Sequence, residues 1–453
     1  MTNPILNTDS YKTSHWKQYP PGTQHVSSYI EARTDRPTVF FGLQAFLVEY
    51  LSQPITFADT AEAAGICEAH GVPFNHEGWI RLLVKHKGAL PLSIQAVPEG
   101  TVVDGRNVLV QVVNTDPEFY WLTSYIETAL LRAVWYPSTV ATNSREIKAV
   151  IKKYLEETAD NTLGLPFKLH DFGARGVSSY ESASLGGLAH LVNFKGTDTM
   201  VALVAAGKYY GEIMPGFSIP AAEHSTITSW GKASEEKAYS NMVTQFGGPG
   251  KLVPVVSDSY DIFKAIDKWT EGGLLKQVQD SGSCVVIRPD SGDPVWTIRN
   301  VFQQFKNKGM FTTNGKGFKM LPSYFRVIQG DGVNKRSIEG ILGTMKTNGW
   351  SSDNIAFGMG GALLQDLTRD TDGYAMKCSA ININGHWQDV FKEAPGKESK
   401  KGRLALMETM GGFKTLRQEE CSVDKNELKE VWRDGKLLKF QTFEEVRKRA
   451  DIN

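Results

Sequence analysis

The chain has 453 residues, of which 41% are hydrophobic and 10% are aromatic. At roughly 100–200 residues per domain, this length predicts two or three domains, or one large barrel with a companion domain. Lysine and arginine together number 50, as do aspartate and glutamate, so the formal net charge is zero. The composition therefore provides no overall field that would attract nucleic acid or an acidic membrane surface.

The cysteines and the N-terminal segment predict the cellular compartment. Four cysteines occur and none forms a C-x-x-C pair, so we expect neither a disulfide scaffold nor a structural zinc site. The first residues lack the basic start and apolar stretch of a secretory signal. No run approaches the ~18 apolar residues that span a membrane. We therefore expect a soluble protein of the reducing cytoplasm.

The first third of the chain mixes helical and strand patterns. Two strands are predicted over residues 90–103 and 107–113, with a glycine-containing turn between them. Pro137 is expected to interrupt the helical pattern that surrounds it. Three helices are predicted in this region, over residues 41–51, 120–133 and 144–157.

A repeated pattern begins at Phe167. A short apolar or β-branched run ends in a small polar tip, and a helical pattern follows. Successive tips lie about 25 to 40 residues apart, which is the length of one strand-plus-helix unit. The tips are Leu169–Gly173, Lys195–Asp198, Ala222–His224, Val256–Tyr260, Ile287–Gly292, Ile328–Gly332 and Phe357–Gly361.

Strands that alternate with helical patterns predict a parallel α/β sheet. Six or seven units in roughly 200 residues are typical of an α/β barrel, and an open doubly wound sheet is the alternative. We assign the barrel and the active site to residues 161–375, and an α+β companion domain to residues 1–160 and 376–453. The last segment contains a predicted strand over 380–384 and an amphipathic helix over 442–450.

The tips are candidate functional positions because parallel α/β folds place their active sites at the carboxyl ends of the strands. Almost every tip carries Asp, Arg, His or Gly. A single Asp or Ser before a helix is often only a helix cap. Seven polar, glycine-rich tips in succession exceed what capping requires.

Several common motifs are absent, including the P-loop, the dinucleotide fingerprint, H-E-x-x-H and G-x-S-x-G. The residues indicate phosphate binding instead. Gly330–Gly332 and Gly358–Gly361 follow predicted strands, where backbone N–H groups can bind an anion, although a tight turn also explains each glycine pair. Arg175, Arg288 and Arg369 can add charge-assisted contacts.

Two further groups extend the phosphate interpretation. Asp258, Asp290 and Asp331 can hold Mg²⁺, mostly through its waters. A basic stretch runs from Lys392 to Arg403, for which a solvated loop is the alternative interpretation. Together these groups predict a phosphorylated sugar substrate with a metal ion.

His224 stands beside Glu223, at the end of an apolar stretch that we predict to be a strand. A lone histidine is more often structural than catalytic. At a phosphate-rich barrel mouth, however, a histidine can contact phosphate or accept a phosphoryl group.

Many segments carry a resemblance to a known family. The chain resembles the nicotinamide phosphoribosyltransferase family of type II phosphoribosyltransferases. The matching segments run in order from the first ten residues to the last fifty. They are Thr8–Lys12, Lys17–Pro21, Tyr120–Thr123, Ala141–Glu146, Lys168–Gly173, Arg175–Ser179, His190–Thr199, Pro220–Thr228, Ser257–Asp261, Ile287–Gly292, Arg326–Gly332, Asn354–Gly358, Leu367–Asp370 and Ser399–Arg403.

The resemblance implies a reaction, a fold and an assembly. Nicotinamide and 5-phosphoribosyl-1-pyrophosphate would give nicotinamide mononucleotide and pyrophosphate with Mg²⁺, in NAD salvage. ATP hydrolysis through a phosphohistidine would assist. The resemblance also implies a (β/α) barrel and a homodimer with composite active sites, acting on small molecules without nucleic acid or membrane.

The resemblance also implies roles for individual residues. Phe172 and Tyr11, the latter from the second subunit, would stack on the two faces of the pyridine ring. Asp198 would accept a hydrogen bond from the amide, and Arg288 would lie near both the ring and the phosphates. The ribose and 5′-phosphate site would comprise Asp290, Gly330, Asp331, Gly360, Gly361 and Arg369. The pyrophosphate and ATP-phosphate region would comprise Arg175, Lys377 and the phosphorylated His224, with Arg33, Lys392 and Lys397 from the second subunit.

Two other functions are considered beside this one. A nicotinate phosphoribosyltransferase of the same fold is the nearest rival, and Asp198 argues against it because a carboxylate repels a carboxylate substrate. A non-catalytic binding protein on this scaffold is the second. The presence of His224, Arg288, Asp290 and Asp331 together argues against that second function.

Overall fold

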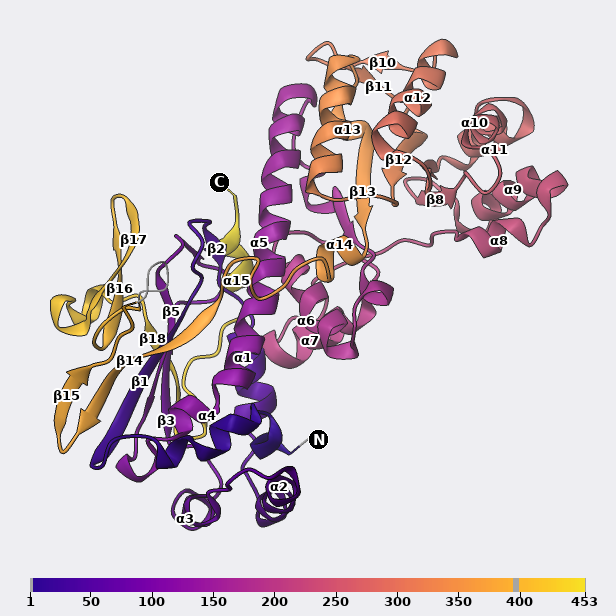
Figure 1. Cartoon of the computed structure of the whole chain (residues 1–453). Helices are drawn as coiled ribbons and strands as arrows, with labels where there is room; N and C mark the ends of the chain where they lie inside the picture. Colours follow the sequence, from indigo (N-terminus) through magenta and orange to yellow (C-terminus); the bar gives the residue numbers. More distant parts are fainter. Residues whose placement is uncertain (1–2, 394–398, 453) are drawn as a thin grey trace. The chain divides into compact units, whose positions relative to one another are not determined.

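The computed structural model describes residues 3–393 and 399–452, and its contacts divide the chain into two compact units (Figure 1). The sequence-based domain limits lie at 160/161 and 375/376, and the main limits of the two units lie at 142/143 and 366/367. The first unit contains the described residues up to Thr142, with Ala205–Glu212 and Leu367–Asp451. The second contains Asn143–Val204, Ile213–Asp366 and Ile452.

A seven-stranded antiparallel sheet forms the centre of the first unit (Figure 1). Its interior strands are rich in β-branched residues, and the core includes Tyr29, Ile94, Val110 and Trp432. The strand over residues 92–96 buries every second residue, as expected for a strand with one face in the core. In sheet order, the strands are β15 (His386–Asp389), β14 (Ala375–Ile383), β1 (Thr23–Glu31), β5 (Val108–Asn114), β3 (Leu92–Ala96), β18 (Lys429–Arg433) and β19 (Lys436–Leu437).

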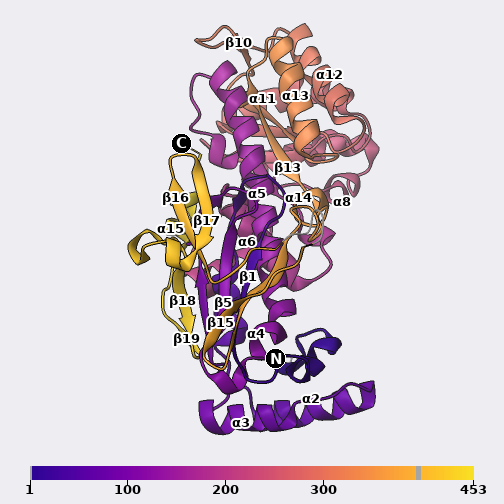
Figure 2. The same cartoon turned by 60° about the vertical axis from the view of Figure 1, so that its left-hand side comes forward.

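Smaller elements complete the first unit. The C-terminal helix begins after the capping residue Thr442, and this confirms the amphipathic helix predicted there. Figure 2 shows α2 and α3 together at the bottom of the view and the β16–β17 hairpin in yellow. The elements are β2 (Thr38–Val39), β4 (Val102–Val103), β16 (Leu404–Thr409), β17 (Gly412–Arg417), α1 (Leu43–Phe46), α2 (Phe57–His70), α3 (His76–His86), α4 (Leu122–Tyr125) and α15 (Phe443–Ala450).

The predicted break at Pro137 is wrong, because one helix, α5 (Glu127–Thr158), continues through it. Proline removes one intrahelical hydrogen bond, and tertiary contacts stabilise the helix at this point. The Ser138 hydroxyl lies 3.0 Å from both the backbone nitrogen and the carbonyl oxygen of Phe41. Gly42 lies so close that a Cβ there would be 2.3 Å from Cγ of Pro137 and 2.9 Å from the carbonyl oxygen of Ala133.

We expect Gly42→Ala to lower the free energy of unfolding by at least about 2 kcal/mol, because the new Cβ meets Pro137 and the backbone φ is +101°. Chemical denaturation measures the loss. Gly71→Ala is the matched control, since φ is +81° there and nothing lies within 4 Å of the added Cβ. The control should lose only about 1 kcal/mol. Equal losses in both variants would show that the contact with α5 has no energetic importance.

A six-stranded parallel sheet forms the second unit, and this confirms the predicted parallel α/β sheet. Six of the seven predicted tips follow its strands. The exception is Ala222–His224. The segment before it is irregular and joins the sheet through an isolated β-bridge between Phe217 and Gly196. In sheet order, the strands are β7 (Gly196–Thr197), β6 (Leu169–Asp171), β13 (Ile355–Met359), β12 (Phe325–Gln329), β9 (Cys284–Arg288) and β8 (Leu252–Val256).

Amphipathic helices connect these strands, and Asp261, Asp293 and Asn334 cap three of them. In the described ranges, no helix is both long and apolar enough to cross a membrane. The helices are α6 (Tyr180–Leu191), α7 (Met200–Tyr210, whose last residues belong to the first unit), α8 (His224–Thr228), α9 (Glu235–Phe246), α10 (Ile262–Thr270), α11 (Gly272–Ser281), α12 (Pro294–Asn307), α13 (Lys335–Thr347) and α14 (Gly361–Leu364). The short strands β10 (Thr312–Thr313) and β11 (Lys319–Met320) form a separate hairpin.

Candidate active site

A cavity of about 390 Å³ lies within the second unit, and residues from both ends of the parallel strands line it. At the carboxyl ends the lining includes Phe172, Asp198 and Arg288, which come from three different strand ends. At the opposite ends it includes Lys168 and Asp353. The walls between are largely apolar, so the cavity suits a flat, uncharged ring with polar groups at its edge.

Phe172 occupies its position because two neighbouring residues are glycines. A Cβ on Gly358 would lie 1.9 Å from Cε2 of Phe172, so only glycine leaves room for the ring. A Cβ on Gly330 would lie 3.8 Å from the same atom and 2.8 Å from Oδ1 of Asp290. The backbone N–H of Phe172 donates to the carbonyl of Met359, 3.0 Å away. The glycine-rich tips therefore bring the ring next to Asp290.

Asp198 follows β7, and its carboxylate is exposed at the cavity. Its backbone N–H donates to the carbonyl of Asp171, 2.9 Å away. The Ser218 hydroxyl donates to Oδ1 of Asp198 over 2.5 Å. Burial lowers the pKa of neighbouring His170, and the charge of Asp198 opposes that shift. Ser218 therefore orients a carboxylate at the cavity edge, a contact that the sequence patterns did not reveal.

His224, the first residue of α8, lies among three polar side chains. Its Nδ1 atom is 3.0 Å from the Ser259 hydroxyl. Its Nε2 atom is 3.5 Å from Oδ2 of Asp290 and 3.8 Å from Oδ1 of Asp258. The side chain retains 47% of its exposure, so a solute can reach the ring. The prediction that His224 ends a strand is wrong, because Pro215 and Pro220 lie in the segment before it and proline cannot donate to a sheet ladder.

Asp258 and Asp290 do not cap helices, since Asp261 and Asp293 take that position on α10 and α12. Oδ2 of Asp258 accepts from the backbone N–H of Asp290 at 2.8 Å and from the Ser291 hydroxyl at 2.6 Å. Its other oxygen, Oδ1, is buried and has no hydrogen-bond partner in the described part of the chain. A buried acceptor without a donor is costly, so this oxygen is available for a ligand.

Arg288 supplies the positive charge beside these carboxylates. Its Nη2 atom is 3.5 Å from Oδ2 of Asp290. Its Nε atom is buried without an acceptor among residues 3–393 and 399–452. Across the same described ranges, no three His, Cys, Asp or Glu side chains are grouped closely enough to hold a metal ion directly.

The remaining predicted phosphate ligands of this unit lie on loops after β6, β12 and β13. Arg175 is exposed in a short 3₁₀ turn, Ala174–Gly176. A Cβ on Gly176 would lie 3.0 Å from Cα of Gly361, so the loop that carries Arg175 packs against Gly361. Asp331 is exposed, and its carbonyl accepts from Nε2 of Gln329 at 2.8 Å.

The other predicted site residues belong to the first unit. Tyr11 is 60% exposed on the 3₁₀ segment Ser10–Lys17. The neighbouring Lys12 is buried and pairs with Glu127 at 2.6 Å, which anchors that segment. Lys397 lies outside the described residues. Four cationic residues complete the predicted set of this unit: Arg33, Arg369, Lys377 and Lys392.

Three of these cations lie near the fourth, Lys377. Burial lowers the pKa of Lys377, and Arg33, Lys392 and Arg369 lower it further, while Glu127 opposes the shift. Nη2 of Arg33 is buried without an acceptor in the described ranges. Neighbouring like charges with an unused donor form a site suited to an anion.

Two family models and several curated relatives match the chain. Residues 167–436 match the nicotinate phosphoribosyltransferase (NAPRTase) family, and residues 3–94 match the nicotinamide phosphoribosyltransferase N-terminal domain. The chain is 49% identical to nicotinamide phosphoribosyltransferase of Xanthomonas campestris, over 100% of this chain and 98% of that protein. It is 30% identical to the protein of that name from Acinetobacter baylyi, over 99% and 97%.

Solved structures show the same fold at low identity. Human nicotinic acid phosphoribosyltransferase superposes with a TM-score of 0.60 at 15% identity, covering 98% of this chain and 92% of that chain. Nicotinate-nucleotide pyrophosphorylase from Pyrococcus furiosus gives 0.59 at 17% identity, covering 99% and 95%.

Proposed function

The chain belongs to the nicotinamide phosphoribosyltransferase family, and we propose on that basis that it makes nicotinamide mononucleotide and pyrophosphate from nicotinamide and 5-phosphoribosyl-1-pyrophosphate. The observation that carries the proposal is the meeting of Phe172, Asp198 and Arg288 at one end of a largely apolar cavity. This end lies beside the His224, Asp258 and Asp290 cluster. The product would enter NAD salvage.

Nicotinamide fits the chemistry of this cavity end. Phe172 offers an aromatic face for the pyridine ring. One oxygen of Asp198 accepts from Ser218, which leaves the other oxygen to accept an N–H of the carboxamide. A neutral amide gains this hydrogen bond, whereas the carboxylate of nicotinate meets a like charge. Arg288 would lie near both the ring and the phosphate groups.

The phosphate groups are assigned to the surrounding loops. Asp290, Gly330, Asp331, Gly360, Gly361 and Arg369 would bind the ribose and its 5′-phosphate. Arg175, Lys377 and His224 would bind pyrophosphate and the ATP phosphates, with Arg33, Lys392 and Lys397 from a second subunit. A Cβ on Gly360 or Gly361 would have no neighbour closer than 3.8 Å, and this supports the assignment because an anion can approach backbone N–H groups there.

Mg²⁺ suits the carboxylates of this site. The buried, unpartnered Oδ1 of Asp258 is a hard oxygen donor near Asp290. Asp258, Asp290 and Asp331 would hold the ion mostly through its waters. When bound, the ion would stabilise negative charge on the departing pyrophosphate.

The reaction requires positioning more than proton transfer. The pyridine nitrogen forms a bond to the anomeric carbon of the ribose, and the bond from that carbon to the pyrophosphate oxygen breaks. The nitrogen lone pair is already nucleophilic, so no strong general base is needed. Arg288 and the lysines and arginines of the site would stabilise the leaving anion, and stacking would align the ring.

His224 is the proposed phosphoryl acceptor from ATP. Its ring is accessible and lies beside carboxylates that can share a hydrated cation. A bond from a ring nitrogen to the γ-phosphorus would form as ADP leaves. The phosphorylated ring would be a dianionic neighbour for Mg²⁺ and the basic groups, and the cation that it attracts would strengthen binding of 5-phosphoribosyl-1-pyrophosphate.

We also propose the finer features of the architecture. The parallel sheet would belong to a (β/α) barrel of the type II phosphoribosyltransferase kind, with the antiparallel unit as its companion and dimerisation domain. The protein would act in the cytoplasm as a homodimer with composite sites, to which Tyr11 and Arg33 come from the second subunit.

Composite sites predict complementation between two inactive variants. Tyr11→Ala and Asp290→Ala chains should each be inactive as homodimers. After subunit exchange, one site in each heterodimer has both residues intact, so up to about half of the heterodimer sites should recover. Activity is measured on isolated heterodimers carrying two different tags. Inactivity of verified heterodimers would count against shared sites.

The direct test of the proposed function is product formation. The purified protein with nicotinamide, 5-phosphoribosyl-1-pyrophosphate and Mg²⁺ should release nicotinamide mononucleotide and pyrophosphate in equal amounts. Asp290→Ala should not. A folded wild-type protein that forms neither product would reject the proposal and favour a non-catalytic binding protein on this scaffold.

A further inference from the structure

We propose that Glu31 is a positioning residue that arranges the phosphate-binding cations of the first unit. The inference rests on the proposed function and extends it, because it assigns a role to an acidic side chain within a site for anions. Glu31 is the last residue of β1, and only 4% of it is exposed.

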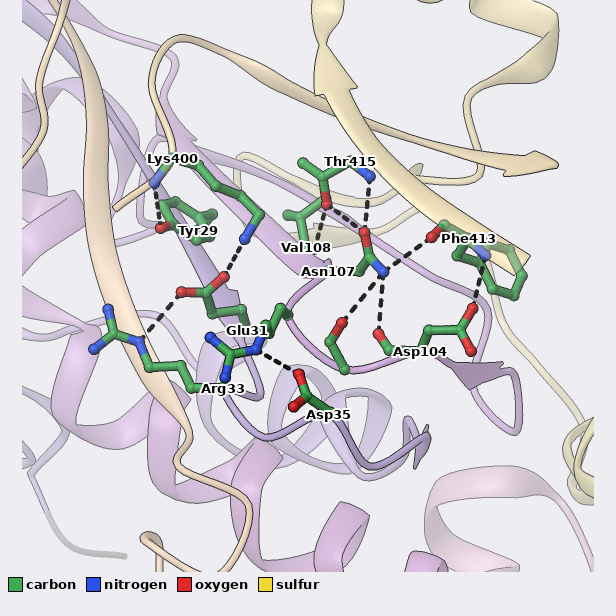
Figure 3. Close-up of polar contacts among 12 residues, drawn as sticks. Tyr29, Glu31, Arg33, Asp35, Asp104, Asn107, Val108, Lys400, Phe413 and Thr415 are labelled. Atoms are coloured by element: carbon green, nitrogen blue, oxygen red, sulfur yellow. Dashed lines mark hydrogen bonds and ion pairs between the residues drawn. The ribbon is translucent and has the colours of Figure 1, made fainter. Parts of the chain in front are cut away.

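The carboxylate of Glu31 holds two cations from distant parts of the chain (Figure 3). Nε of Arg33 lies 3.2 Å from Oε1. Nζ of Lys400 pairs with the other oxygen, Oε2. The backbone of Glu31 is itself fixed, since it pairs with Ala375 of β14 on one side and Val108 of β5 on the other. A rigid strand end therefore sets where both cations lie.

Tyr29 strengthens the attachment of Lys400. The backbone N–H of Lys400 donates to the hydroxyl of Tyr29 over 2.9 Å (Figure 3). Its Nζ atom lies 5.6 Å from the centre of the Tyr29 ring. Tyr29 is fully buried two residues before Glu31 on β1. Lys400 is thus held at its main chain and at its ammonium group by the same strand.

The attachment extends to Lys392, one of the proposed phosphate ligands. The N–H of Lys392 donates to the Ser399 hydroxyl over 2.9 Å, and the N–H of Ser399 donates to the carbonyl of Lys392 over 3.3 Å. Ser399 directly precedes Lys400. Glu31 therefore fixes Arg33 directly, and fixes the backbone that carries Lys392 through Lys400.

The arrangement leaves donors free for an anion. Glu31 engages Nε of Arg33, while Nη2 of the same guanidinium is buried with no acceptor in residues 3–393 and 399–452. Lys377 lies opposite Tyr29 in the β1–β14 register. Arg33 lies close enough to Lys377 that its charge, together with burial, lowers the pKa of Lys377. Glu31 reduces the repulsion between such cations and keeps them in one place.

Positioning and simple electrostatics predict opposite results when the charge of Glu31 is removed. A carboxylate near a bound phosphate repels it, so by electrostatics alone Glu31→Gln should lower KM for the phosphate substrates. If Glu31 positions Arg33 and Lys400, the same change should weaken binding. Loss of hydrogen bonds between charged groups typically weakens an interaction by about tenfold or more.

The test is a steady-state comparison of Glu31→Gln with Asp35→Asn. Asp35 loses the same charge four residues away, but its side chain is 87% exposed and pairs with Arg106 at 2.6 Å (Figure 3). Glu31→Gln should raise KM for 5-phosphoribosyl-1-pyrophosphate and for ATP about tenfold and leave KM for nicotinamide within about twofold. Asp35→Asn should change none of the three. An unchanged or lower KM for the phosphate substrates in Glu31→Gln, or an equal rise in Asp35→Asn, would overturn the proposal.

A charge-neutral variant and a proteolysis assay keep the test decisive if Glu31→Gln folds poorly. Tyr29→Phe removes only the hydroxyl that accepts from Lys400, and it should raise the same two KM values several-fold. Trypsin should cleave after Lys400 faster in both variants than in Asp35→Asn, and equal cleavage would overturn the proposal. Proteolysis does not depend on enzyme activity. If the wild-type protein makes no nicotinamide mononucleotide, that result rejects the proposed function, and the proteolysis assay still tests the role of Glu31.

Discussion

Replacement of His224 by alanine should abolish ATP hydrolysis and ATP stimulation, while a slow, ATP-independent transfer of the phosphoribosyl group remains. The physical reason is the position of the ring. Its Nδ1 atom contacts Ser259, and its Nε2 atom faces Asp290 and Asp258 at 3.5 and 3.8 Å. A phosphoryl group there would lie beside carboxylates that can share hydrated Mg²⁺. The remaining cavity residues still position the two substrates, so the basal reaction should survive.

The measurement for His224 is protein labelling from γ-labelled ATP. Phosphohistidine is stable in alkali and labile in acid, so wild type should carry label with that signature and His224→Ala should carry none. His386→Ala is the control, because His386 is an exposed histidine on β15 of the other unit. Equal labelling of wild type and His224→Ala would exclude His224 as the acceptor. Activity of His224→Ala that still rises with ATP would remove it from the coupling step.

Asp198→Asn should shift the preference for nicotinamide over nicotinate by more than about tenfold. A hydrogen bond to a charged group contributes roughly 1.5–3 kcal/mol, and the variant loses the charge that favours the amide and repels the acid. The measured quantity is the ratio of kcat/KM for the two pyridines. An unchanged ratio would show that Asp198 does not distinguish the amide of nicotinamide from the carboxylate of nicotinate.

Ser218→Ala separates orientation of the carboxylate from its charge. The variant removes the donor to Oδ1 of Asp198 and keeps the negative charge. It should raise KM for nicotinamide a few-fold and leave nicotinate disfavoured. A shift in preference as large as that of Asp198→Asn would mean that the hydrogen bond with Ser218, rather than the charge, selects the substrate.

The repeated polar tips predicted the parallel sheet. Each strand and the polar residues after it are adjacent in the sequence, so the pattern can be recognised without tertiary contacts. Parallel strands end at one edge, so the tips were expected to lie near one another, and Phe172, Asp198 and Arg288 do line one cavity. The roles of Phe172 and Asp198 were implied only by the family resemblance. The contact of Ser259 with His224 was not predictable, because it joins the first residue of α8 to a loop 35 residues away.

Proline had opposite effects at two places, and only tertiary contacts distinguish them. Pro137 does not end α5, because the helix is held to the segment at Phe41 and Gly42. Gly42 packs against Pro137, and the Ser138 hydroxyl contacts the backbone of Phe41. Before His224, Pro215 and Pro220 leave the segment without a strand. The link between Glu31 and Lys400 crosses 369 positions of sequence, so no local pattern could indicate it.

A competition assay compares nicotinamide and nicotinate in one reaction, where both pyridines meet the same enzyme and the same phosphate substrates. Equimolar nicotinamide and nicotinate are supplied with limiting 5-phosphoribosyl-1-pyrophosphate, ATP and Mg²⁺, and the two mononucleotide products are separated and quantified. The site formed by Phe172, Asp198 and Arg288 predicts that nicotinamide mononucleotide exceeds nicotinate mononucleotide by at least about tenfold. Equal amounts of the two products, or an excess of nicotinate mononucleotide, would show that this site does not select nicotinamide.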